Sequence, residues 1–277
     1  MMLEWTSNVW GKLMGPYGSG TEVPAFLQQL TQEYHQERAD ELFQEYLFHQ
    51  NTIYTVTYAA VPYLVHIACS TEDLKVQCEL FITCGIIEAS RDHNEAAPFP
   101  ATWMELAEHI GASTCTDIYS EYLKAIRKIA LLGPEVLAYA THALENPVEK
   151  RYILSANAAY QGLYTLANML LTFTMGDEYV VTCPKCKEEM YLWPNEDDTC
   201  IQAFTQDPVF NEEQNAHTII PATKFSNREQ KILQEQAQAI GEDKLIRHLP
   251  YLASKIDCPS CHITIQIWPS LLSLFES

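Results

Sequence analysis

Apolar residues recur at helical spacing from residue 23 to residue 175, with short polar breaks between the apolar runs. In residues 39–47, 74–89 and 119–130 the apolar positions lie three and four apart, which is typical of one face of an amphipathic helix. We expect Ser70 or Thr71 to cap the second of these helices, and Gly133-Pro134 to end the third. The pattern predicts a mainly α-helical body.

Two further segments complete this body. Residues 54–68 are apolar nearly all round, so we expect a central buried helix with Pro62 near its start or at a kink. Residues 149–175 read as one long helical stretch that closes the array. Successive helices with one apolar stripe each favour an irregular HEAT-like antiparallel helical array over residues 1–175, although a plain multi-helix bundle fits equally well.

The residue pattern changes after Gly176, where β-branched and aromatic residues predict short strands. Residues 195–225 show no clear period and read as a loop or mobile insertion. A helix is predicted from Ser226 to Gln238, because Ser226 and Glu229 have the spacing of a capping box, and another over residues 242–254. We therefore expect residues 176–277 to form a small zinc-ribbon β module with a helical insertion at about 195–255.

One motif occurs twice in this second region. The segment CPKCKEEMYLWP begins at Cys183 and the segment CPSCHITIQIWP begins at Cys258. In both, we expect a strand that ends at the Trp-Pro pair. Two such turns direct four sulfurs toward one point, as tetrahedral zinc requires. The motif predicts two like half-sites around one structural Zn²⁺, related by an approximate twofold axis, with the ligands Cys183, Cys186, Cys258 and Cys261.

Other interpretations of these cysteines are a pair of redox CxxC motifs, buried disulfides, or His262 replacing its neighbour Cys261 as a ligand. Neither CxxC follows a strand and opens a helix, as a thioredoxin-like redox motif would. Four thiolates also leave no coordination position open for water or substrate. We therefore expect the metal to be structural and not catalytic.

The composition of the chain indicates its cellular compartment and the charge of the partners that it could bind. The chain has nine cysteines and neither a signal-peptide pattern nor an apolar stretch of membrane-spanning length, so we expect a cytoplasmic protein with reduced thiols. Its formal charge of −19, from 36 acidic and 17 basic residues, opposes binding to nucleic acid or an anionic membrane. Residues 176–215 alone hold ten acids and two lysines, a net of −8. Such a surface would attract a basic partner.

Signals of enzyme chemistry are weak. The glycine-rich GPYGSG at residues 15–20 lacks the Lys-Ser/Thr of a phosphate loop, and HExxH, GxSxG and GxGxxG are absent. We predict no catalytic residue and expect that the protein is not an enzyme.

Two N-terminal segments resemble those of bacterial HEAT-like proteins: WGKLMGPYGSGTEVPAFLQQL from Trp10 and HQNTIYTVTYAAVPYLVHIA from His49. Asn51 stands where that family usually has glycine, and asparagine also tolerates the turn. Acidic proteins of this kind look similar to immunity proteins of polymorphic toxin systems. The resemblance implies a cognate toxin domain with a basic cleft as the partner.

On this hypothesis an acidic surface covers the active site of the toxin. The candidate contacts are acids on one predicted helix and in the predicted loop: Glu37, Asp40, Glu41, Glu45, Glu196, Asp197, Asp198, Glu212 and Glu213. The alternatives are a zinc-ribbon adaptor in transcription or RNA metabolism and an enzyme of unrecognised type.

Overall fold

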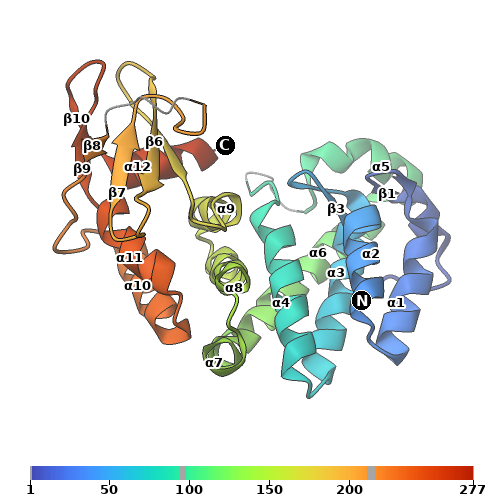
Figure 1. The fold of residues 1–277 in the computed structure, drawn as a ribbon. Coiled ribbons are helices and arrows are strands. Elements are labelled where there is room, and N and C mark those ends of the chain that lie inside the picture. Colours follow the sequence, from blue (N-terminus) through green and yellow to red (C-terminus); the bar gives the residue numbers. More distant parts are fainter. Residues whose placement is uncertain (1, 94–97, 211–215, 277) are drawn as a thin grey trace. The chain divides into compact units, whose positions relative to one another are not determined.

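The computed structural model describes residues 2–93, 98–210 and 216–276. The fold is mainly α-helical with small antiparallel sheets (Figure 1), which confirms the predicted fold class. The chain divides into two compact units, Met1–Val136 and Leu137–Ser277. No helix within the described ranges has the length and apolar character needed to span a bilayer.

The division between the units differs from the expected boundary at residues 175 and 176. The helices α8 (Pro147–Tyr160) and α9 (Tyr164–Thr172) pack on each other, α8 contacts α10 (Arg228–Ile240), and α9 contacts α12 (Ile267–Leu272). These two helices therefore belong to the C-terminal unit. The predicted single stretch 149–175 is broken at Gly162, which adopts a positive φ of 77°.

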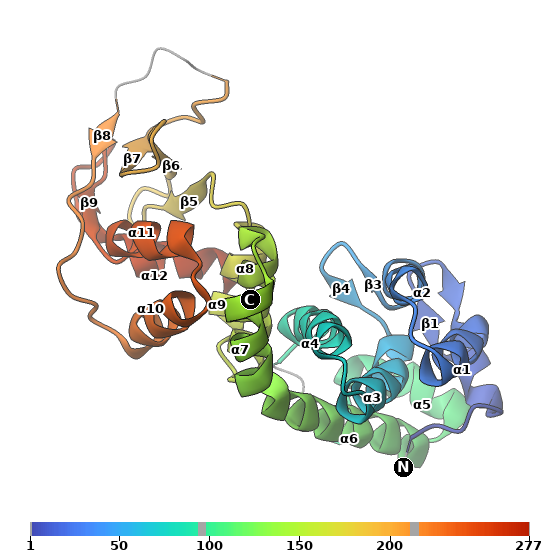
Figure 2. The ribbon, with the colours of Figure 1, turned by 60° about the horizontal axis from the view of Figure 1, so that its bottom comes forward.

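The N-terminal unit is built around α3 (Thr55–Ser70), which packs against helices α1, α4 and α6. Most residues of α3 are buried, as its all-round apolar sequence predicts, and Pro62 lies inside the helix. The helices of this unit surround α3 in both views (Figures 1 and 2). The other helices are α1 (Val23–Gln32), α2 (Gln36–Leu42), α4 (Leu74–Ala89), α5 (Met104–Ile110) and α6 (Ala112–Ile129).

Short elements connect these helices. Two hairpins precede α3, and a π-helix, η3, continues α2 without a break. The remaining elements are the 3-10 turns η1 (Asn8–Lys12), η2 (Gly20–Glu22), η4 (Ala101–Trp103) and η5 (Ala130–Leu132), the π-helix η3 (Phe43–Leu47), and the strands β1 (Met14–Gly15), β2 (Gly18–Ser19), β3 (Phe48–His49) and β4 (Thr52–Ile53).

One predicted helix cap is wrong, and one predicted helix end is confirmed. The side chain of Asp73, and not Ser70 or Thr71, caps α4 by accepting a hydrogen bond from the Lys75 backbone N–H. The helix over residues 119–130 does end before Gly133-Pro134, since α6 ends at Ile129 and η5 at Leu132. The pair then begins α7 (Gly133–Ala143), because a residue in the first helical turn does not need a backbone N–H and proline fits there.

The C-terminal unit combines helices with two β elements. A four-stranded antiparallel sheet has the order β5-β6-β7-β8, and β9 and β10 form a separate hairpin (Figure 1). The segment 195–225 is therefore not entirely a loop, since it supplies β7 and β8. The elements not yet given are β5 (Tyr179–Thr182), β6 (Glu189–Pro194), β7 (Ile201–Phe204), β8 (His217–Thr218), α11 (Asp243–Leu252), β9 (Lys255–Asp257), β10 (Thr264–Gln266) and η6 (Ser273–Phe275).

The predicted helices between the two CxxC motifs are present as α10 and α11. The capping box of α10 is formed by Asn227 and Gln230, one residue later than the predicted pair Ser226 and Glu229. Asn227 accepts a bond from the Gln230 backbone N–H, and the Gln230 side chain accepts from the Asn227 backbone. The prediction found the helix and missed its first turn by one position.

Candidate metal centre

Each CxxC motif forms the turn of a β hairpin. Cys183 and Cys186 lie between β5 and β6, and Cys258 and Cys261 lie between β9 and β10. The last three cross-strand pairs before each turn correspond at a constant offset of 75 residues, for example Thr182 with Glu189 and Asp257 with Thr264. The repeated sequence therefore produces a repeated structure.

Backbone hydrogen bonds close the first turn. The Cys183 N–H donates to the Glu188 carbonyl at 2.9 Å, and the Lys187 N–H donates to the Cys183 carbonyl at 3.0 Å. Lys187 adopts a positive φ of 65°, which reverses the chain directly after the second cysteine. This conformation is uncommon for a residue other than glycine.

The second turn repeats the arrangement. The Cys258 N–H donates to the Ile263 carbonyl at 2.9 Å, and the His262 N–H donates to the Cys258 carbonyl at 2.9 Å. His262 has a φ of 57° and takes the place that Lys187 has in the first turn. It is a turn residue and is not part of the sulfur group, contrary to the alternative in which it replaces Cys261.

The four sulfur atoms lie within 4.8 Å of one another, which places the predicted ligands together. Cys183 Sγ is 3.7 Å from Cys261 Sγ, and Cys186 Sγ is 3.6 Å from Cys258 Sγ. A tetrahedron with metal–sulfur bonds of about 2.3 Å has edges of about 3.8 Å. Both distances thus fit a tetrahedral thiolate site, and the four cysteines could hold a metal ion. The five other cysteines lie outside the group.

The surroundings of these sulfurs favour partial ionisation. The Cys186 backbone N–H lowers the pKa of Cys183 to about 6, because it stabilises the thiolate. The Glu188 backbone N–H lowers the pKa of Cys186, but burial and hydrogen bonds to the neighbouring sulfurs outweigh it and raise this pKa to about 12. Four adjacent thiols cannot all ionise without a cation, so metal binding must release protons.

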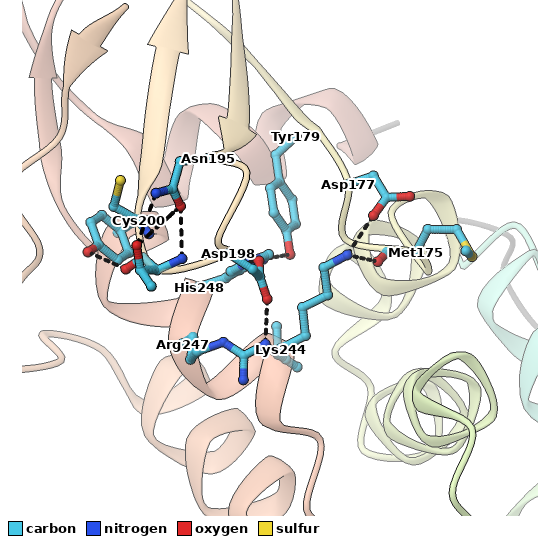
Figure 3. A network of polar contacts seen from close by, with 12 residues as sticks. Met175, Asp177, Tyr179, Asn195, Asp198, Cys200, Lys244, Arg247 and His248 are labelled. Atoms are coloured by element: carbon cyan, nitrogen blue, oxygen red, sulfur yellow. Dashed lines mark hydrogen bonds and ion pairs between the residues drawn. The ribbon is translucent and has the colours of Figure 1, made fainter.

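A polar network centred on the buried His248 joins the β6–β7 connection to α11 in the same unit (Figure 3). His248, which is 2% exposed, hydrogen-bonds Asp198 Oδ1 through Nε2 at 2.7 Å and the Tyr179 hydroxyl through Nδ1 at 3.1 Å. Arg247 donates to the other oxygen of Asp198. These contacts hold the sheet that carries the first cysteine pair against α11, which precedes the second pair.

The network also shifts the pKa values of Asp198 and His248. Burial tends to raise the pKa of Asp198, but the hydrogen bonds from Arg247 and His248 outweigh it and lower this pKa. Burial lowers the pKa of His248 more than the neighbouring Asp198 raises it. A neutral imidazole satisfies both partners, with Nε2–H donating to the carboxylate and Nδ1 accepting from the Tyr179 hydroxyl.

A fully buried ion pair lies beside this network. The side chains of Arg151 and Glu242 are 1% and 0% exposed, and Arg151 Nε lies 3.2 Å from Glu242 Oε1. Arg151 also donates to the Phe173 carbonyl at 2.5 Å. Gly176 has a φ of 62°, and a Cβ there would lie 2.5 Å from the Arg151 guanidinium, so any other residue would strain the backbone and displace this side chain.

The predicted partner contacts occupy several places. Exposed acids lie on α2 and η3 and between β6 and β7: Glu37, Asp40, Glu41, Glu45, Glu196 and Asp197. Asp198 is half-buried and bound to Arg247 and His248, so its carboxylate already has internal partners. Glu212 and Glu213 lie outside the described residues. Sequence spacing gave no sign of the network around His248, because its members meet only through tertiary contacts.

No protein-family model, curated protein or solved structure matches the chain.

Proposed function

We propose that the chain is a non-enzymatic binding protein that neutralises a bacterial toxin domain by covering its active site with an acidic surface. The observation that carries the proposal is the set of exposed carboxylates on α2 and η3, in a chain with a formal charge of −19. The four carboxylates are those of Glu37, Asp40, Glu41 and Glu45. Within the described residues, Arg38 is the one cation in ion-pair range of any of them, at 2.6 Å from Glu41. The surface thus keeps most of its negative charge for a partner.

The four-cysteine group supports a structural part in this function. We propose that it holds Zn²⁺, since sulfur ligands with tetrahedral spacing suit zinc. With four thiolates bound, zinc has no position left for water or substrate. Its role is then to join the β5–β6 and β9–β10 hairpins, and recognition falls to the protein surface.

Charge gives this surface a physical advantage. An acidic surface facing a basic cleft accelerates encounter and disfavours partners of the same sign. Toxin domains that act on nucleic acids or nucleotides need positive charge where their substrates bind. A protein that competes for such a cleft would present carboxylates in the place of phosphates.

The proposal is tested by co-expressing the chain with toxin domains encoded beside its gene, and by measuring co-purification and the survival of intoxicated cells. The complex should weaken as ionic strength rises from about 0.1 M to 1 M, which shortens the Debye length from about 10 Å to about 3 Å. Failure to bind any neighbouring toxin, together with no rescue, would refute the function.

Two sets of neutralising substitutions separate the candidate surfaces. One combines Glu37→Gln, Asp40→Asn, Glu41→Gln and Glu45→Gln, and the other combines Glu196→Gln and Asp197→Asn. The first set should reduce rescue and the second should not, since α2 and η3 carry the denser exposed charge. A low-salt gel shift with RNA and DNA tests the adaptor alternative, for which salt-sensitive binding is expected.

A further inference from the structure

A groove of about 710 Å³ lies in the N-terminal unit between the β1–β2 hairpin and the segment formed by α2 and η3. Both views place β1 beside α2 (Figures 1 and 2). Two aromatic rings and three carboxylates line it, together with glycine backbone: Tyr17, Tyr46, Glu22, Glu41 and Glu45. The groove is therefore aromatic on its walls and negative in charge.

The backbone around the groove is unusual at two points. A Cβ on Gly15 would lie 2.7 Å from the Tyr46 carbonyl oxygen, so only glycine lets the hairpin approach η3 this closely. η3 is a five-residue π-helix, and it contributes Glu45 and Tyr46 to the groove. Single π-helical turns are rare and occur frequently at functional sites.

Some side chains that line the groove already have a hydrogen-bond or ion-pair partner within the protein, and others are open to a ligand. Glu22 accepts a hydrogen bond from the Tyr46 hydroxyl at 2.6 Å, and Glu41 pairs with Arg38. No cation among the described residues lies in ion-pair range of Glu45, which is exposed. The Tyr17 side chain is fixed at its hydroxyl, 3.1 Å from His49 Nδ1, while the residue is 67% exposed. A carboxylate and an aromatic ring thus remain open to a ligand.

The flank of the groove already displays a related arrangement. The guanidinium of Arg38 lies 5.3 Å from the centre of the Phe26 ring and 2.6 Å from Glu41. An arginine of α2 is thereby held between an aromatic ring of α1 and a carboxylate of its own helix. Arginine suits this chemistry better than lysine, because its planar group stacks on rings and donates several hydrogen bonds in fixed directions.

We infer that the groove receives an arginine side chain of a basic protein partner, with the guanidinium beside Tyr17 and in contact with Glu22 and Glu45. The inference rests on the proposed function, since it takes a basic protein as the partner. It adds the position and the chemistry of the contact.

The test is fluorescence anisotropy of the full chain with a labelled twelve-residue peptide that contains four arginines among glycines. A twin peptide with citrulline keeps the shape and removes the charge. Glu45→Gln combined with Tyr17→Leu should weaken binding of the arginine peptide about tenfold, from one exposed ion pair and one cation–π contact. Glu72→Gln is the control, because it changes an exposed acid of the same unit, between α3 and α4, that neither lines the groove nor belongs to the proposed contact surface.

Three results would overturn the inference: no binding of the arginine peptide, equal binding of the citrulline peptide, or equal weakening by Glu72→Gln and by the Glu45→Gln/Tyr17→Leu variant. Circular dichroism checks that the variants remain folded.

Cell rescue separates this inference from the proposed function. If the wild-type chain protects cells and the Glu45→Gln/Tyr17→Leu variant protects them equally, the groove is refuted and the function stands. If the peptide binds in the groove but no toxin is bound, the function is refuted alone.

Discussion

Replacing Cys258 by serine should release the metal and destabilise the C-terminal unit. A metal at the four sulfurs connects the two hairpin turns and closes a loop of 71 residues, from Lys187 to Asp257. Cross-linking a loop of this length restricts the unfolded chain by about 4 kcal/mol. Loss of the metal therefore removes about that much from the free energy of unfolding, before any effect of direct metal–sulfur bonding is added.

The measurement combines elemental analysis with hydrogen exchange. Protein produced in zinc-replete medium should contain one metal ion per chain, and Cys258→Ser protein should contain none. Peptides covering residues 179–194 and 255–272 should then exchange faster, whereas peptides from α3 and α4 should not change, because these helices lie in the other unit. Cys200→Ser is the matched control, since Cys200 lies in the same unit and outside the sulfur group.

The reasoning would be refuted if the Cys258→Ser protein kept its metal and its urea-unfolding midpoint. It would also be refuted if the wild-type protein contained no metal. Loss of metal from Cys200→Ser would show that the ligand set is wrong.

Three further perturbations test the packing. Acidification from pH 6.5 to about 4 should destabilise the N-terminal unit. Burial, and then the neighbouring Arg91, lower the pKa of His93 to about 4 in the folded protein. The unfolded chain therefore takes up a proton on this imidazole at a higher pH than the folded chain does, which favours unfolding. Urea titrations at several pH values measure this, and His93→Gln should show a smaller pH dependence. Glu242→Ala should cost about 3–5 kcal/mol, because it leaves the Arg151 guanidinium buried without its carboxylate; an unchanged thermal midpoint would contradict this. Gly176→Ala should destabilise the protein more than Gly162→Ala, since both have positive φ but only Gly176 lies against a side chain. Differential scanning calorimetry compares the two variants.

The helices were predictable where one local pattern determined them. α3 is apolar on all sides in sequence and central in structure, and the periodic stretch 74–89 coincides with α4. Helix ends were less predictable, because several neighbouring residues can act as caps. Asp73 and Asn227 lie within a few residues of the predicted caps Thr71 and Ser226, and only the final chain path selects among them.

The repeated motif shows both the strength and the limit of local reasoning. The four-cysteine group was predictable because each CxxC turn depends on four consecutive residues. The segments after the turns were not, since Trp193 continues β6 by pairing with Gln202 of β7, whereas Trp268 has no such pair and lies in the first turn of α12. Similar sequences thus ended in a strand and in a helix according to their neighbours.

The network around His248 could not be predicted at all. His248 lies 50 residues from Asp198 and 69 residues from Tyr179 along the chain. No spacing rule connects them. The same holds for the groove, which combines residues from a hairpin and a π-helix.

The constant offset between the two cysteine pairs also bears on the order of events during translation. A ribosome adds about 5–20 residues per second, so the 75 residues from Cys183 to Cys258 take about 4–15 s to synthesise. During that interval the nascent chain offers one finished pair of thiols without its complement. A site with four sulfur ligands can therefore form only after the second pair has been synthesised.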